Sequence, residues 1–232
     1  MMPFVTYRIT FNNTLSAIAR DKSCAQPFVN ASNLLQRMIE SEGQSKSRQV
    51  SPDRISYTIV IGSLLGTGTV TFEDVLRAQE LLQQSLRMHN ERGWDCKPDT
   101  NVFATVMRVC GKVRGTMAER DRALDVALLA MESCRSGRFG EADHVSFFSC
   151  MKAINQLCQD ERRKRELLKS LFEICSAEGH VSKEVIMSMK LGVWKNGAPP
   201  LQANWSRKVP FHSKPEAGKI SHQPQTHKSR TL

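Results

Sequence analysis

A short pattern returns four times along the chain at almost constant spacing, and it constrains the fold more than any other feature. Each copy opens on an aromatic residue: Phe11, Tyr57, Phe103 and Phe147. Successive aromatics lie 46, 46 and 44 positions apart. Apolar residues follow each aromatic at i+4 and i+7, as Ile61 and Leu64 follow Tyr57. This spacing places the three side chains on one helix face, so the four copies predict a helical repeat.

A second helical pattern follows each aromatic helix. Residues 31–35 (Ala-Ser-Asn-Leu-Leu) resemble residues 78–82 (Ala-Gln-Glu-Leu-Leu), and looser copies lie at 123–127 and 167–172. A small Ala beside Leu pairs allows a second helix to pack closely on the first. We therefore expect four helix–turn–helix units of about 45 residues, within the range of known helical repeats.

Polar segments rich in turn residues separate these helices. The breaks between units are expected at 43–51, 93–98 and 136–142, and the turns within units at 21–27, 66–71 and 112–117. Thr71, with Asp74 three residues later, predicts a helix N-cap. We assign residues 8–53, 54–99, 100–143 and 144–180 to four units, and 181–196 to a partial capping helix. The polar segment 197–232 is expected to be a disordered basic tail.

The chain has a formal net charge of +10. About half of this surplus lies in the tail segment 205–232, and the rest lies on the folded part. A surplus of this size is typical of proteins that bind nucleic acid or an anionic surface, although a basic tail on an otherwise ordinary protein also explains half of it.

No catalytic motif is present, and we do not expect an enzyme, a cofactor or a small-molecule substrate. Gly66 and Gly68 form too short a segment for a phosphate-binding loop, and the six His are isolated in sequence. The seven Cys include no CxxC pair, so we expect free, buried thiols in a reducing compartment and no metal site. No apolar stretch approaches the ~20 residues that span a bilayer, and a membrane partner is not expected.

The units resemble the pentatricopeptide repeat (PPR) family over about residues 8–190. That family's unit opens with an apolar–Thr–Tyr–Asn pattern and closes with Pro-Asp. Residues 9–12 (Ile-Thr-Phe-Asn) and 55–58 (Ile-Ser-Tyr-Thr) match the opening, and 52–53 and 98–99 (Pro-Asp) match the close. Two departures stand out. These units are about ten residues longer than the family's repeat of about thirty-five. The third and fourth units also carry Ala104 and Phe148 after the aromatic, where the family has a polar residue.

The resemblance implies an all-α, TPR-like fold: a right-handed α-solenoid of antiparallel helix pairs with about four repeats. It also implies binding of single-stranded RNA, with one base read per repeat. The residue after the aromatic and the closing Asp would form each reading pair, giving Asn12 with Asp53, Thr58 with Asp99, and Ala104 with Asp143. The first two pairs are similar to those that prefer uracil and guanine, and the third predicts no base.

Three other side chains would lie against neighbouring bases: Ile9, Ile55 and Asn101. Four nearby arginines are expected to meet phosphates: Arg8, Arg20, Arg54 and Arg108. The resemblance further implies a role in RNA processing, stability or translation in a mitochondrion or plastid.

Simpler interpretations stay open at each position. Asp53, Asp99 and Asp143 precede helices, where Asp is a preferred N-cap. The four aromatics are more typical of a core than of stacking platforms. The charged run 161–166 is more typical of a solvated helix face than of a phosphate grip. The same helix pairs would also suit a protein–protein interaction scaffold without base readout.

Overall fold

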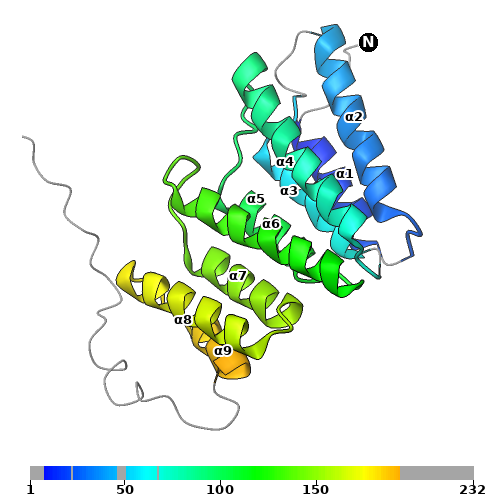
Figure 1. Ribbon diagram of the computed structural model, residues 1–232. Coiled ribbons are helices and arrows are strands. Elements are labelled where there is room, and N and C mark those ends of the chain that lie inside the picture. The colour runs from blue at the N-terminus through cyan, green and yellow to red at the C-terminus, as the bar shows by residue number, and fades with distance from the viewer. Residues whose placement is uncertain (1–7, 22, 46–50, 67, 194–232) are drawn as a thin grey trace, which may run out of the picture. The chain divides into compact units, whose positions relative to one another are not determined.

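The computed structural model describes residues 8–21, 23–45, 51–66 and 68–193, all within the first of two units, residues 1–195. These residues are all-α, as predicted, and they form no sheet. The elements are α1 (Arg8–Arg20), α2 (Pro27–Ser45), α3 (Arg54–Ser63), the 3-10 turn η1 (Leu64–Gly66), α4 (Phe72–Arg92), α5 (Thr100–Cys110), α6 (Met117–Arg135), α7 (His144–Leu157), α8 (Glu161–Ala177) and α9 (Lys183–Val193) (Figure 1). The expected tail, 197–232, and the end of the expected capping helix, 194–196, lie outside the described residues.

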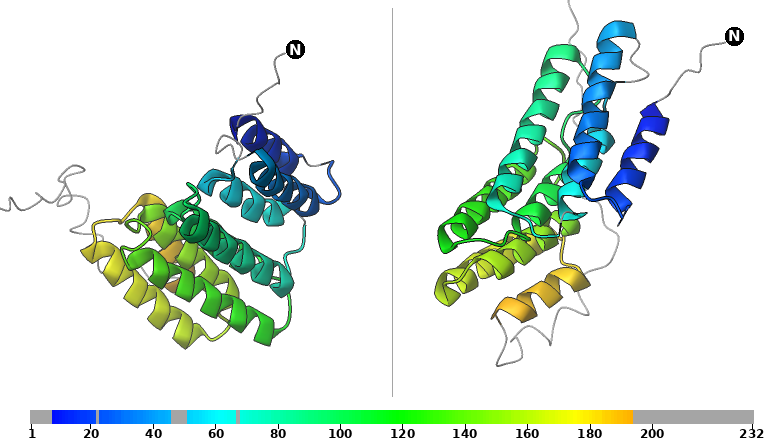
Figure 2. Two further views of the ribbon diagram at one scale, coloured as in Figure 1. Left: turned by 90° about the horizontal axis from the view of Figure 1, so that it is seen from above. Right: turned by 90° about the vertical axis from the view of Figure 1, so that its right-hand side faces the viewer.

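The helices form two sets that differ in their neighbours. The odd-numbered helices pack one against the next, α1 on α3, α3 on α5, α5 on α7 and α7 on α9. Each even-numbered helix packs on the two odd-numbered helices that flank it in the chain. We call these sets the odd-helix layer and the even-helix layer. Their order from α1 to α9 can be followed in Figure 2.

Short-range capping explains why most helices begin where they do. Asp53, Asp99 and Asp143 are the N-caps of α3, α5 and α7, and each carboxylate accepts a hydrogen bond from a backbone N–H of the first turn. Thr71 and Thr116 cap α4 and α6, each in a capping box with an acidic residue three positions later. The prediction for Thr71 is confirmed, and capping is an observed role of all three Asp residues.

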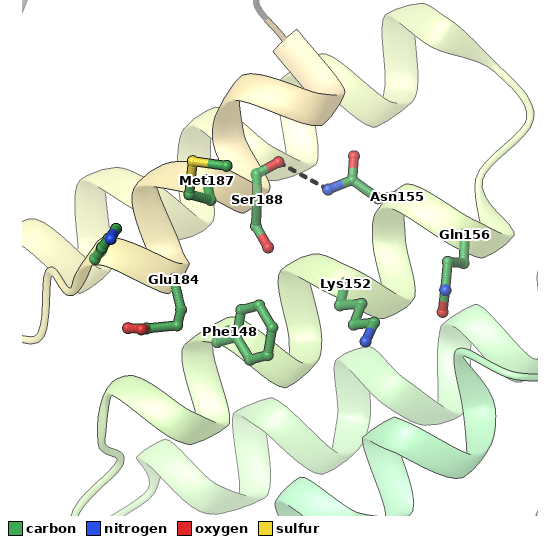
Figure 3. Close-up of a pocket in the computed structure, with 8 residues that line it drawn as sticks. Phe148, Lys152, Asn155, Gln156, Glu184, Met187 and Ser188 are labelled. Carbon is green, nitrogen blue, oxygen red and sulfur yellow. Dashed lines mark hydrogen bonds between the residues drawn. The ribbon is translucent and has the colours of Figure 1, made fainter.

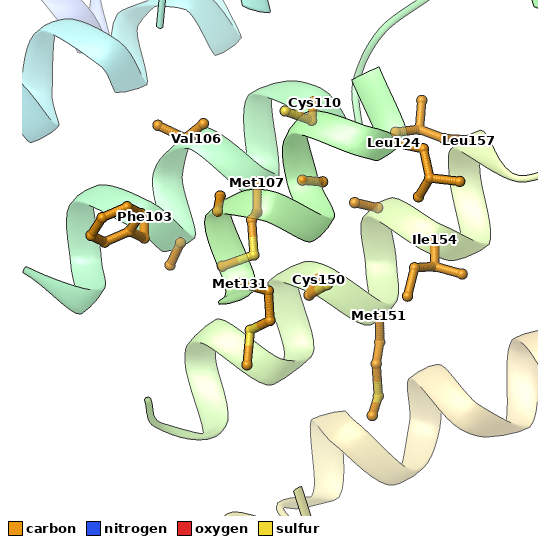
Figure 4. Close-up of a cluster of buried hydrophobic side chains, with 14 of the residues drawn as sticks. Phe103, Val106, Met107, Cys110, Leu124, Met131, Cys150, Met151, Ile154 and Leu157 are labelled. Atoms are coloured by element: carbon orange, nitrogen blue, oxygen red, sulfur yellow. The ribbon is translucent and has the colours of Figure 1, made fainter. Parts of the chain in front are cut away.

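The aromatic series lies in the core, as the periodicity favours. Tyr57, Phe103 and Phe147 are buried, and Phe11 is half-buried against the same cluster as Tyr57. The larger cluster joins α5, α6 and α7, with Met107, Leu124 and Ile154 among its members (Figure 4).

The cysteines belong to this packing. All seven are free; Cys24 is half-buried and the other six are buried. Burial raises the pKa of the Cys110 and Cys150 thiols to about 12, so they stay protonated at neutral pH. They therefore pack as small apolar side chains.

Tyr57 is the one member of the aromatic series that carries a hydroxyl, and this hydroxyl is buried without a hydrogen-bond partner in the described part of the chain. Desolvation also raises the pKa of the Tyr57 hydroxyl, because its buried surroundings disfavour the charged phenolate. Tyr57→Phe is therefore expected to raise the free energy of unfolding by about 1 kcal/mol, since it removes an unsatisfied polar group. Urea unfolding measures this change. The reverse substitution at the equivalent position, Phe147→Tyr, should destabilise, and a loss of stability in Tyr57→Phe would contradict the packing described.

Candidate nucleic-acid interface

Equivalent residues in the first turns of four odd-numbered helices face solvent. Ile9 in α1 is 72% exposed, and Ile55 in α3 is 52% exposed. Asn101 in α5 and Val145 in α7 occupy the same place and are also exposed. The side chains predicted to lie against bases are therefore exposed to solvent, where a ligand could contact them. Two of them, Ile9 and Ile55, are among the most exposed large apolar side chains of the described chain.

The first predicted reading pair meets directly across α1 and α3. Asn12 Nδ2 donates a hydrogen bond of 3.2 Å to Asp53 Oδ1, and Ser56 Oγ donates one of 2.6 Å to Asn12 Oδ1. The Asp53 carboxylate also accepts from the Ser56 backbone N–H, and Arg8 Nε lies 3.7 Å from Asp53 Oδ2. A base at this position would compete with contacts already made, and Ser56 belongs to the same network.

The second predicted pair is arranged differently. Thr58 Oγ1 donates to the Arg54 carbonyl, while Asp99 accepts from the backbone N–H groups of Asn101 and Val102. Arg54 Nε lies 3.3 Å from Asp99 Oδ2, and its Nη1 lies 3.5 Å from Asp95 Oδ1. The Arg54 residue therefore contacts both members of the pair, and no direct Thr58–Asp99 hydrogen bond is found among the described residues.

The third predicted pair presents little surface. Ala104 is only 3% exposed within α5, and Asp143 is engaged in a capping box with Ser146. The absence of a predicted base here agrees with an Ala104 side chain that a ligand cannot reach. In the fourth unit, the equivalent Phe148 is half-buried on α7.

Two of the arginines expected to meet phosphates contact aspartates in this structure. Arg8 and Arg54 each lie three positions before the aromatic of their unit, and each pairs with the Asp that caps the next odd-numbered helix. In the third unit, Thr100 Oγ1 donates to the Glu141 carbonyl from the equivalent position. These half-exposed ion pairs contribute up to about 1 kcal/mol each. They form an inter-unit contact that sequence reasoning missed. The signal for it is the repeated Arg at equivalent positions, the same residues for which the sequence predicts a phosphate contact.

Net positive charge, rather than the number of basic residues, distinguishes the odd-numbered helices. Its five helices carry one acidic residue, Glu184, and these basic residues: Arg8, Arg20, Arg54, Arg108, Lys152, Lys183 and Lys190. The even-numbered helices carry acidic and basic residues in similar numbers. Because N-cap aspartates flank the odd-numbered helices, their positive character is greatest away from the first turns. A surface of this kind attracts polyanions.

The basic run of α8 is mostly exposed to solvent, the interpretation that its sequence favoured, whereas the Lys164 side chain is only 12% exposed. Arg162 is 88% exposed and pairs with Glu166, and Lys164 pairs with Glu161. Arg163 Nη2 lies 3.5 Å from Asp125 Oδ1 of α6. Most of this local positive charge is therefore offset by nearby carboxylates.

The described residues include no group of three or more His, Cys, Asp or Glu side chains that could hold a metal ion. None of the described helices has the length and apolar character needed to cross a bilayer. Comparison with protein-family models, with curated proteins and with solved structures finds no match for this chain.

Proposed function

We propose that this chain binds single-stranded RNA along its odd-helix layer, as a PPR-like, right-handed α-solenoid of about four repeats. The observation that carries the proposal is the direct contact between Asn12 and Asp53 across two neighbouring helices. An amide and a carboxylate held together can supply both donors and acceptors to a base edge when the base replaces some of their contacts with each other, with Ser56 and with Arg8. Exposed Ile9 and Ile55 lie beside this pair at the starts of α1 and α3, where apolar side chains suit the faces of bases.

The distribution of charge supports the same partner. An RNA strand that follows the odd-helix layer would meet the basic residues of α5, α7 and α9 with Glu184 as the one acidic residue of these helices. Phosphate neutralisation would supply most of the affinity, and the Asn12–Asp53 pair would supply selectivity at one position. A role in processing, stability or translation of transcripts in a mitochondrion or plastid follows from the resemblance alone and belongs to the proposal.

A protein-binding scaffold is the second candidate, and one observation favours it. The carboxylates of Asp53 and Asp99 are already occupied by caps and arginines, while exposed apolar side chains line the starts of α1 and α3. A partner protein could use such a surface without reading any base. The two candidates differ in their response to substitution of Asn12.

Asn12→Ala is expected to change the base preference of the protein at one position of the bound RNA. Loss of one or two hydrogen bonds of about 1 kcal/mol each lowers affinity for the preferred base by about fivefold to thirtyfold. Selection from a randomised single-stranded RNA pool, with duplex DNA as competitor, measures the preference. Asn13→Ala, at the exposed neighbouring position, is the matched control and should leave the enriched sequences unchanged. An equal loss of binding to every RNA in Asn12→Ala would contradict base readout.

A further inference from the structure

Two cavities adjoin each other on the odd-helix layer, away from the Asn12–Asp53 pair. The larger, of about 440 Å³, lies between α7 and α9 and is lined by Phe148, Lys152, Gln156 and Met187 among others. The smaller, of about 180 Å³, lies between α5 and α7. Lys152 and Gln156 line both cavities, so the two lie on either side of these side chains and differ in their chemistry.

The larger cavity has apolar walls suited to a flat ring. Figure 3 shows Phe148 and Met187 facing the same space between α7 and α9, with Glu184 toward one end and Lys152 and Gln156 toward the other. Asn155 Nδ2 donates a hydrogen bond of 2.9 Å to the Ser188 carbonyl, which holds α9 against α7. An aromatic ring and a thioether on opposite walls favour stacking of a base, and this contact tolerates any base.

The smaller cavity has the character of an anion site. Arg108, Lys112 and Lys152 line it; all three are exposed, and none has an acidic partner among the described residues. Ser149 lines it too. Its side chain is 2% exposed, and its Oγ has no hydrogen-bond partner in the described part of the chain. A buried hydroxyl without a partner is uncommon. The Ser149 Oγ is closed to solvent in this structure, so a rotation about χ1 is needed to bring its O–H to a phosphate oxygen in this cavity.

The cationic residues also have a structural role that does not explain the whole cluster. Arg108 and Lys112 lie at the C-terminal end of α5, where positive charge complements the helix dipole. Lys152 lies in the middle of α7, where the dipole gives no such reason. Its Nζ lies over the Phe148 ring, 5.7 Å from the centroid, so a base stacked on that face would displace this cation–π contact. Lys152 therefore stands at the boundary between the apolar and the cationic cavity.

We propose that these two cavities together bind one nucleotide of the RNA. The base would lie against Phe148 and Met187, and the phosphate would lie among Arg108, Lys112 and Lys152 and accept a hydrogen bond from Ser149 Oγ. The inference rests on the proposed function and assigns the fourth unit a stacking contact in place of a reading pair. It accounts for an aromatic residue at position 148 and for the unpartnered hydroxyl of Ser149.

The test is a titration of the full chain, labelled with ¹⁵N, with adenosine 5′-monophosphate, adenosine and inorganic phosphate as separate probes. The monophosphate should shift the amide signals of α7 and α9 around Phe148, Lys152 and Met187. Inorganic phosphate should shift those around Ser149 and Lys152 only, and adenosine those around Phe148 and Met187. Shifts that map to other helices, or no shifts with the monophosphate, would overturn the site.

Two variants separate binding from folding. Phe148→Leu keeps apolar bulk but removes the ring, and should weaken monophosphate binding about tenfold. Ser149→Ala should weaken the binding of phosphate severalfold while leaving the protein at least as stable, because the unpartnered hydroxyl is removed. A Ser149→Ala protein with unchanged phosphate affinity would contradict the site. Ser170→Ala, on exposed surface of α8, is the matched control.

Failure of this site and failure of the proposed function give different results. If RNA selection still depends on Asn12 while the monophosphate causes no shifts at α7 and α9, the site is wrong and RNA binding stands. If the monophosphate maps to α7 and α9 but no single-stranded RNA is retained over duplex DNA, the nucleotide site stands and the RNA proposal is wrong.

Discussion

Phe147→Ala is expected to lower the free energy of unfolding by about 3–5 kcal/mol, the range for truncating a buried aromatic side chain. Phe147 is fully buried in α7, and its ring stacks on His180 with 5.8 Å between centroids. The helix that carries it packs against α5, α6, α8 and α9, so the cavity left behind would weaken contacts in both layers. Because small domains are stable by about 5–15 kcal/mol, this variant would lose a large part of its stability.

Urea unfolding followed by far-UV circular dichroism measures the loss. Phe148→Ala, the same substitution at the next residue of α7, is the control and should cost less than half as much, because Phe148 is half-buried and faces a cavity. If Phe148→Ala lowered the free energy of unfolding as much as Phe147→Ala or more, Phe147 would not be the central core residue that the packing indicates.

The helices were predictable because the signals for them are local. The i, i+4, i+7 spacing after Tyr57 or Phe103 depends only on helix geometry. The observed α5 contains all three residues of its set, whereas the i+7 residue of the Tyr57 set, Leu64, begins the 3-10 turn η1 directly after α3. The expected turn at 21–27 lies between α1 and α2, and that at 112–117 precedes α6. Capping by Thr71 requires only a neighbour three residues away.

The candidate site was only partly predictable because its contacts join different units. Asn12 and Asp53 were paired by the resemblance, and they do meet. The contact of Arg54 with Asp99 depends on α3 and α5 lying side by side, which the residues themselves do not reveal. The burial of Ala104 was also not predictable, because Ala is common both in cores and on surfaces. Whether it is buried depends on which helices pack around it.

The uneven distribution of charge between layers was within reach of sequence reasoning. The net charge of the whole chain hides it, because the even-numbered helices carry similar numbers of acidic and basic residues. If the net charge is counted for each set of predicted helices, the odd-numbered helices differ clearly from the even-numbered ones. The cavity between α7 and α9 gave no such signal, because its walls come from helices that are far apart in sequence.

Reversing charge in the odd-helix layer is expected to abolish most RNA affinity without unfolding the protein. The variant Arg20→Glu, Arg108→Glu, Lys152→Glu changes one exposed residue on each of α1, α5 and α7. If these residues meet phosphates, affinity for single-stranded RNA should fall by about 100-fold near physiological salt. The negative slope of log affinity against log salt concentration should also become shallower by about 2, because fewer counterions are released. Arg20 and Arg108 lie in the last turns of α1 and α5, so reversing their charges opposes the helix dipoles and costs about 0.5–1 kcal/mol each, which a small domain tolerates.

The matched control makes the same change of net charge in the even-helix layer. Arg87→Glu, Arg165→Glu, Lys169→Glu alters exposed residues of α4 and α8 and removes the same total charge. Its effect on RNA affinity should be small, since only the long-range attraction of the whole protein is weakened. Circular dichroism of both variants checks that the helices are retained.

Equilibrium binding of these two variants and the unaltered chain to one single-stranded RNA pool therefore tests the central claim, that RNA lies along the odd-helix layer. If RNA lies along the odd-helix layer, we expect tight binding by the unaltered chain, little change in the even-layer variant, and a loss of about 100-fold in the odd-layer variant. Equal losses in both variants would show that only net charge matters. A larger loss in the even-layer variant, or no binding by the unaltered chain above a duplex DNA competitor, would contradict the assignment of the odd-helix layer to RNA.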